Sequence, residues 1–162
     1  MDIRDSGRRR QVAVCGPSVC TPEEARHAYR IGQLLAAAGA TVICGGGPGV
    51  MDSAARGATE HGGLAIGVLS GPAGDASPAL SATVATGLGQ ARNAFIVNSA
   101  DAVIVVGGSW GTLSELAIAM RVGSAPVIVL GGWKVVDQGG QPVPGPVEVG
   151  TPEEAVRLAL GG

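Results

Sequence analysis

Short runs of Val, Ile and Ala alternate along the chain with longer segments in which apolar residues recur at helical spacing. This alternation is typical of a parallel sheet with helices packed on it. It predicts strands at residues 12–15, 41–44, 64–69, 82–85, 102–106 and 126–130. It predicts helices at residues 21–38, 50–60, 88–99, 112–122 and 151–160. The expected fold class is therefore α/β: a Rossmann-like, doubly wound, mostly parallel sheet with helices on both faces, in a single domain.

Short sequence motifs define the boundaries or the burial of several of these elements. Thr21-Pro22-Glu23-Glu24 predicts a helix start in which Thr caps, Pro takes the first helical position and Glu24 completes a capping box. Thr151-Pro152-Glu153-Glu154 repeats the pattern and predicts a second capping box. The strand at 102–106 is almost purely apolar and is expected to be buried on both faces. The Gly- and Pro-rich stretch 131–146 gives no clear assignment.

Composition and charge exclude several classes of protein. The chain has 162 residues, 46% of them apolar and 15% charged, which suits one domain with a real core. A net charge of −2 and an aromatic content of 2% argue against nucleic acid as a partner, because such binding relies on basic and aromatic side chains. Neither a signal peptide nor a membrane span is evident, so we expect a cytoplasmic protein without membrane partners. Residues 1–10, with their three arginines, are expected to form a flexible tail before the domain at 11–162.

Metal and redox chemistry find little support in the sequence. The three cysteines, Cys15, Cys20 and Cys44, lack the spacing of a zinc site or a disulfide framework. His27 and His61 stand without other ligand residues nearby in the sequence. We therefore expect no metal site and no cofactor required for folding.

Two glycine-rich loops carry the strongest chemical signal. Gly45-Gly46-Gly47-Pro48-Gly49 and Gly107-Gly108-Ser109-Trp110-Gly111 each follow a predicted strand and open a helix. Helix N-termini at the carboxyl ends of parallel strands attract phosphate, and glycine lets backbone N–H groups approach an anion. We expect a phosphate-bearing small molecule to bind between the two loops, and a side chain at Gly108 to block it.

Several familiar nucleotide and cofactor sites are absent from the sequence. It contains neither G-x-G-x-x-G nor G-x-x-x-x-G-K-[ST], which argues against a classical dehydrogenase and a P-loop ATPase. The single lysine, Lys134, lies far from both loops in the irregular stretch and is a poor Schiff base for pyridoxal phosphate. We therefore expect no pyridoxal phosphate.

The glycine loops resemble those of a known family. Gly45 to Asp52 is similar to the G-G-G-x-x-G-L-M loop of the Lonely Guy (LOG) family, and Gly107 to Glu115 to its P-G-G-x-G-T-x-x-E motif. Cys15-Gly16-Pro17-Ser18 resembles that family's C-G-S-S. LOG enzymes are phosphoribohydrolases that release a cytokinin base from its riboside 5′-monophosphate. Relatives were formerly labelled lysine decarboxylases, and the shortage of lysine argues against that activity.

A second branch of the same superfamily matches more closely. Thr86 to Asn93, followed by Ser99 to Ile104, resembles the branch that contains molybdenum-cofactor carrier proteins. Arg92 is retained from the LOG pattern, but Asn93 replaces its lysine and Val106 its proline. The resemblance implies a carrier for a molybdopterin-like cofactor. The alternatives are a phosphoribohydrolase acting on cytokinin riboside monophosphate or AMP, and a nucleotide-sensing domain without turnover.

The candidate site residues follow from the loops and from the resemblance. Arg92 could pair bidentately with phosphate, and Glu115 could place a carboxylate at the mouth of the site or form a capping box with Thr112. These two, Arg92 and Glu115, are the catalytic candidates if the protein is an enzyme. Trp110 could stack on a heterocycle or stand exposed. The expected phosphate- and ligand-binding residues are Gly16, Ser18, Gly45, Gly46, Gly47, Gly49, Met51, Arg92, Asn93, Gly107, Gly108, Ser109, Trp110, Gly111, Thr112 and Glu115.

Self-association is the one protein partner that the sequence predicts. The helices expected at 88–99 and 112–122 carry apolar residues around much of their circumference. A helix that is apolar on more than one side needs a second partner besides its own sheet. We therefore expect a homo-oligomer, a dimer or larger.

Overall fold

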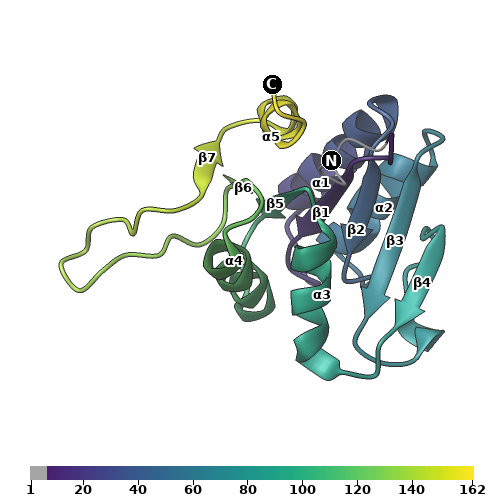
Figure 1. Cartoon of the computed structure of the whole chain (residues 1–162), viewed down its shortest axis with the longest axis horizontal. Helices are drawn as coiled ribbons and strands as arrows, with labels where there is room; N and C mark the ends of the chain where they lie inside the picture. The colour runs from purple at the N-terminus through teal and green to yellow at the C-terminus, as the bar shows by residue number, and fades with distance from the viewer. Residues whose placement is uncertain (1–6) are drawn as a thin grey trace.

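A computed structural model describes residues 7–162 and contains one parallel sheet (Figure 1). Seven strands in the described chain lie in the order β4-β3-β2-β1-β5-β6-β7, and every neighbouring pair is parallel. They are β1 Gln11–Cys15, β2 Thr41–Cys44, β3 Leu64–Leu69, β4 Ala82–Ala85, β5 Ala102–Val106, β6 Val127–Leu130 and β7 Val147–Val149. The order reverses direction at β1, which is the topology of a doubly wound sheet.

Helices cover both faces of the sheet. They are α1 Pro22–Ala37, α2 Val50–Thr59, α3 Arg92–Ser99, α4 Trp110–Val122 and α5 Pro152–Ala159, with short 3-10 turns η2 Ala73–Asp75 and η3 Gly89–Ala91. One buried cluster joins α1, α2 and α5 to the sheet, and a second joins α3 and α4 to the opposite face. Alternate residues of β1 belong to different clusters, Val12 and Val14 to the first and Ala13 and Cys15 to the second. The expected fold class is confirmed.

The starts of two helices differ from the expectation. Helix α4 begins two residues earlier, because Ser109 is its N-cap and accepts a hydrogen bond from the Thr112 N–H at 3.2 Å. The capping box expected between Thr112 and Glu115 is therefore wrong. The segment before Arg92 is the tight turn η3, and the α-helix proper begins at Arg92. Gly87 and Gly89 both have positive φ, which favours a turn over a regular helical start.

Of the two expected capping boxes, the first is confirmed and the second is half formed. In α1, Thr21 and Glu24 exchange both hydrogen bonds. In α5, Thr151 accepts from the Glu154 N–H, but the Glu154 carboxylate accepts from the N–H of Gly150, one residue before the cap.

The stretch 131–146, called the arm here, leaves the body of the protein between β6 and β7 (Figure 1). Its two sides meet through an antiparallel bridge between Val136 and Pro142 and a hydrogen bond from the Val143 N–H to the Val135 carbonyl. Strand β7 follows the arm at the edge of the sheet. It is a three-residue strand with no counterpart in the sequence-based prediction, because so short a run carries little periodicity.

The N-terminal segment joins the domain before β1 begins. Residues 1–6 of the expected tail lie outside the described residues. Arg8 forms an ion pair with Asp101 at 2.8 Å, and the Arg10 Nε donates to the Ala159 carbonyl at 3.1 Å. No helix in residues 7–162 has the length and apolarity that crossing a membrane requires.

Candidate functional site

Both glycine loops lie at the carboxyl ends of central strands, as their motifs predict. The first follows β2 and the second follows β5, and β1 lies between these two strands. Gly49 shows why the first loop needs glycine. Its φ is +70°, and a Cβ there would collide with the carbonyl oxygens of Pro17 and Ser18. The loop after β1 and the loop after β2 are thus packed backbone to backbone.

A cleft of about 350 Å³ opens beside the first loop. Its walls come from that loop, the end of β3, the turn η2 and the start of α3. Six of the predicted site residues line it: Ser18, Gly45, Gly46, Gly47, Met51 and Arg92. The remaining lining residues are Pro48, Leu69, Ser70, Gly71, Pro72, Asp75 and Ala76. The volume falls within the range of small-molecule sites.

Arg92 is fixed in this cleft by three hydrogen bonds. Its Nη1 donates to the carbonyl oxygens of Gly45 at 2.8 Å and Val68 at 2.7 Å, and its Nε donates to Asn93 Oδ1 at 2.8 Å. Among residues 7–162, its Nη2 has no hydrogen-bond partner. The guanidinium is therefore immobilised on one side and keeps two N–H donors for a ligand.

Asn93 lies outside the cleft and accepts the hydrogen bond from Arg92 Nε. Its side chain is 2% exposed, and its Nδ2 donates to Ser114 Oγ at 2.8 Å. Ser114 Oγ in turn donates to the Gly111 carbonyl at 2.7 Å, in the second glycine loop. A continuous chain of hydrogen bonds thus links Arg92 to the start of α4.

The N-terminus of α2 adds positive potential next to Arg92. Side chains cap α1, α4 and α5, whereas within the described chain no side chain caps the first turn of α2 after Gly49. Free N–H groups and the positive end of the helix dipole stabilise an anion at such a place. Asp52 in that first turn is held by Ser77, whose Oγ donates to its Oδ1 at 2.6 Å.

The second glycine loop lines a separate hollow of only about 10 Å³. Gly107, Gly108, Ser109 and Thr112 contribute to it, and Trp133 of the arm covers it. A Cβ on Gly108 would lie 2.8 Å from the Trp133 backbone nitrogen. A substitution at Gly108 would therefore displace the arm as well as obstruct an anion, so it is not a clean test of ligand binding.

The aromatic residues beside this loop pair with each other. Trp110 is 78% exposed, and its ring meets that of Trp133 edge to face with centroids 5.0 Å apart. The hydroxyls of Ser109 and Thr112 lie 2.9 Å apart at the start of α4.

Glu115 lies deeper than the expected position at the mouth of the site. Its side chain is 8% exposed and does not line the cleft. Burial raises the pKa of Glu115, an effect that neighbouring Cys15 and Arg92 oppose. Burial, together with the Glu115 carboxylate, also raises the pKa of the Cys15 thiol. The carboxyl group is thus part of the buried layer beneath the second loop.

Comparison with known proteins identifies the family. The family model described as the SLOG cluster4 family matches residues 9–156, which is most of the chain. The chain belongs to the SLOG cluster4 family. The resemblance inferred from the glycine loops, to the superfamily of LOG and molybdenum-cofactor carrier proteins, is confirmed.

Relatives of this SLOG cluster4 chain match it almost end to end. It is 38% identical over 155 residues to an uncharacterized protein of Archaeoglobus fulgidus, covering 93% of this chain and 94% of that one. The molybdenum cofactor binding protein of Rippkaea orientalis is 35% identical, with a TM-score of 0.84 and coverage of 94% and 96%. The molybdenum cofactor carrier protein of Chlamydomonas reinhardtii is 28% identical, with a TM-score of 0.80 and coverage of 94% and 97%.

Several residues of the cleft escaped prediction from the sequence. Ser70 and Asp75 lie in a loop without a recognisable motif, and Val68 contributes through its backbone carbonyl alone. Ser114 stands inside the second motif at a variable position, and only its hydrogen bond to Asn93 reveals its role. Only their positions in the folded chain reveal these residues.

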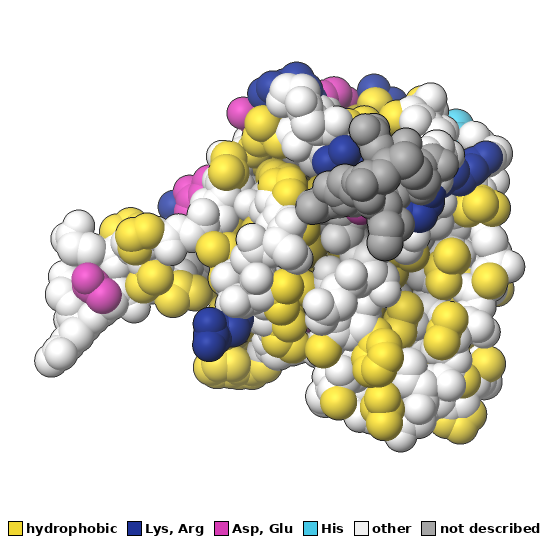
Figure 2. Space-filling model, in the orientation of Figure 1, with side chains coloured by type: hydrophobic (Ala, Val, Ile, Leu, Met, Phe, Trp, Pro, Cys, Tyr) yellow, Lys and Arg dark blue, Asp and Glu magenta, His cyan; other side chains and the backbone are white. Residues whose placement is uncertain are grey.

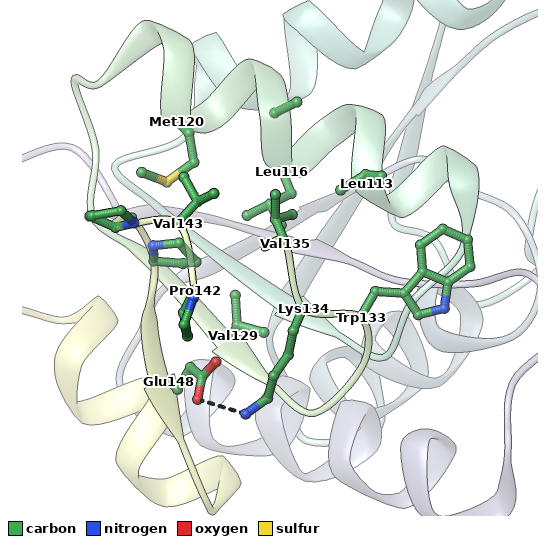
Figure 3. A pocket seen from close by; sticks show the side chains of 14 residues that line it. Leu113, Leu116, Met120, Val129, Trp133, Lys134, Val135, Pro142, Val143 and Glu148 are labelled. Carbon is green, nitrogen blue, oxygen red and sulfur yellow. Dashed lines mark hydrogen bonds and ion pairs between the residues drawn. The ribbon is translucent and has the colours of Figure 1, made fainter. Parts of the chain in front are cut away.

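A larger groove, of about 470 Å³, lies between α4 and the arm, apart from the cleft at Arg92 and next to the hollow of the second glycine loop (Figure 3). Leu113, Leu116 and Met120 of α4 face Val135 and Val143 of the arm across it. At its end Lys134 and Glu148 form an ion pair at 3.5 Å. Its apolar lining distinguishes this groove from the polar cleft at Arg92.

Proposed function

We propose that this protein binds a phosphate-bearing pterin in the cleft beside Gly45–Gly49 and acts as a carrier of the molybdenum cofactor. The observation that carries the proposal is the geometry of Arg92. Three hydrogen bonds hold its guanidinium at the cleft, while its Nη2 remains available. A preformed cation of this kind lowers the entropic cost of binding an anion.

The surroundings of Arg92 support phosphate as the anion. The first turn of α2, which no side chain in residues 7–162 caps and in which the Val50 N–H donates to the Pro17 carbonyl, lies at the same cleft as the Gly45–Gly47 backbone. A Cβ on Gly45 would lie 3.1 Å from both terminal nitrogens of Arg92, so the backbone and the guanidinium are in close contact. The second loop contributes indirectly, because Asn93 links Arg92 through Ser114 to the Gly111 carbonyl.

The ligand class comes from the relatives. The Rippkaea orientalis protein binds the molybdenum cofactor, and the Chlamydomonas reinhardtii protein carries it. The cofactor is a phosphorylated pterin, and it would be cargo here, with no part in folding. The cleft offers Met51, Leu69 and Pro72 as apolar contacts for a ring beside the phosphate position.

Fluorescence anisotropy with a pterin monophosphate tests the proposal. The wild-type protein should bind the phosphorylated pterin at least tenfold more tightly than the same pterin without phosphate, since charge-assisted hydrogen bonds to phosphate are lost in the latter. Gly47→Val should abolish binding. A Cβ at Gly47 meets only the flexible end of Met51, so the chain can fold while both side chains fill the cleft.

Gly150→Val is the matched control for this substitution. Gly150 has open space around its Cβ position and lies outside the cleft. It should leave affinity unchanged. Equal affinity of the wild type for the two pterins, or full binding by Gly47→Val, would contradict the proposal.

The alternative of a phosphoribohydrolase is less well supported by the geometry. Cleavage of an N-glycosidic bond needs a carboxylate near the ribose. Glu115 is buried beside Cys15, and burial raises its pKa. We expect weak or no release of adenine from AMP or of N6-substituted bases from their ribotides, measured by chromatography. Turnover of about 1 per second, abolished by Glu115→Gln, would instead establish the enzyme.

We also propose that the protein associates with itself through α4 and the arm. Figure 2 shows hydrophobic side chains gathered along the arm, where Val135, Val136 and Val143 are exposed. An isolated two-stranded hairpin is marginally stable in water. Each copy of the chain carries both the groove and the arm. Two copies related by a twofold axis would therefore each cover the apolar surface of the other.

A further inference from the structure

The cleft beside the first glycine loop has two charged side chains of opposite sign among its described lining residues. Arg92 lies at the start of α3, and Asp75 lies in the turn η2 on the other side of the first loop. Arg92 is partly buried and held in place, whereas Asp75 is exposed. A ligand that complements this cleft therefore needs an anionic group at one position and hydrogen-bond donors at another.

The Asp75 carboxylate is available for such donors. Within residues 7–162, no hydrogen bond or ion pair engages it. The turn that carries it is anchored on its C-terminal side through Ser77. The Ser77 N–H donates to the Gly46 carbonyl at 2.8 Å, and Ser77 Oγ donates to Asp52. The loop that presents Asp75 is thus tied to the same glycine loop that forms the floor of the cleft.

The chemistry of a carboxylate selects among heterocycles. A carboxylate only accepts hydrogen bonds, and its two oxygens match two parallel N–H donors. A 2-amino-4-oxopyrimidine ring, which pterin and guanine share, presents a ring N–H next to an exocyclic amino group. Adenine presents an amino group next to a ring nitrogen with a lone pair, which would face the carboxylate unfavourably.

We propose that Asp75 is the specificity-determining residue of the cleft and binds the 2-amino-4-oxopyrimidine edge of the ligand, while Arg92 binds its phosphate. This inference rests on the proposed function and adds the recognition of the ring. It requires the ligand to span the cleft, whose volume of about 350 Å³ accommodates a two-ring heterocycle with a phosphate. It also explains how this chain would exclude adenine nucleotides from a phosphate site that every nucleotide could use.

Calorimetric titration with GMP and AMP tests the inference directly. The two probes share ribose and phosphate and differ in the edge that would face Asp75. The wild type should bind GMP roughly tenfold or more tightly than AMP, as expected for one bidentate pair. Asp75→Asn should abolish that preference, because the acceptor and the donor of an amide complement the amino group and the ring nitrogen of adenine and leave one donor of guanine unpaired. Asp137→Asn, the same charge change in the arm and outside the cleft, should keep the wild-type preference.

The outcomes separate this inference from the proposed function. If the wild type binds the pterin monophosphate but binds GMP and AMP equally, the role of Asp75 is refuted and the carrier proposal stands. If Asp75→Asn retains the full preference for GMP, the role of Asp75 is likewise refuted. If the wild type binds neither the pterin monophosphate nor GMP, both proposals are refuted together.

Discussion

Replacing Asn93 by Ala should destabilise the protein far more than the same change five residues later at Asn98. Asn93 is buried and makes two hydrogen bonds, one from the charged Arg92 and one to Ser114. A hydrogen bond to a charged group contributes about 1.5–3 kcal/mol and a neutral one about 1 kcal/mol. The expected loss in the free energy of unfolding is therefore about 3 kcal/mol. Affinity for a pterin monophosphate should fall about tenfold, because Arg92 loses one of its three anchors.

Asn98 provides the matched control on the same helix. It is exposed, and its Nδ2 donates only to the Ala94 carbonyl within α3. Asn98→Ala should cost no more than about 0.5 kcal/mol. Urea denaturation of both variants measures the difference, with an unchanged slope indicating that the denatured state is unaffected. Losses of equal size in the two variants would refute the view that Asn93 organises the site.

Three further expectations concern the buried groups and the apolar groove. Because burial raises the pKa of Glu115 in the folded state, the folded protein loses stability as pH rises above the ordinary glutamate pKa and through the raised one. Glu115→Gln should therefore show a smaller loss of stability between acidic and neutral pH than the wild type, measured by thermal unfolding. Met120→Glu should convert an oligomer, seen by light scattering, into a monomer, and an unchanged mass would exclude the groove as the interface. A thiol reagent at neutral pH should modify Cys20 first. Burial and Glu24 raise the pKa of Cys20 too, but this thiol is partly exposed, whereas Cys15 and Cys44 are buried and burial raises the pKa of Cys44 to about 11. Rapid modification of all three thiols in the folded protein would contradict that order.

The fold was predictable because its signals are local and repeated. The apolar runs of β1, β2 and β5 give continuous buried strands, and Thr21 with Glu24 defines the start of α1. The six expected strands all form, each with bounds within one residue. The predicted start of α4 was two residues late, because Ser109 and Thr112 are both favourable N-cap residues. The turn after β5 decides which of them caps the helix.

The candidate site was only partly predictable, for physical reasons. The glycine loops and Arg92 have recognisable motifs, so six lining residues of the cleft could be named in advance. The position of Glu115 depends on how α4 packs on the sheet, which brings this side chain to Cys15 at the end of β1 and which a motif does not encode. Asp75 comes into the cleft because Ser77 ties its loop to Gly46 and Asp52, two residues that lie far from Ser77 in the sequence. Contacts between residues so distant in the sequence are visible only in the three-dimensional structure.

The measurement that tests the central claim most directly is native mass spectrometry of the protein purified without added ligand from cells that make the molybdenum cofactor. The account predicts a bound mass that corresponds to a phosphorylated pterin, present on the wild type and on Gly150→Val and absent from Gly47→Val. An adenine nucleotide on the wild type, or protein that emerges without any bound small molecule, would contradict the claim that this cleft carries a pterin phosphate.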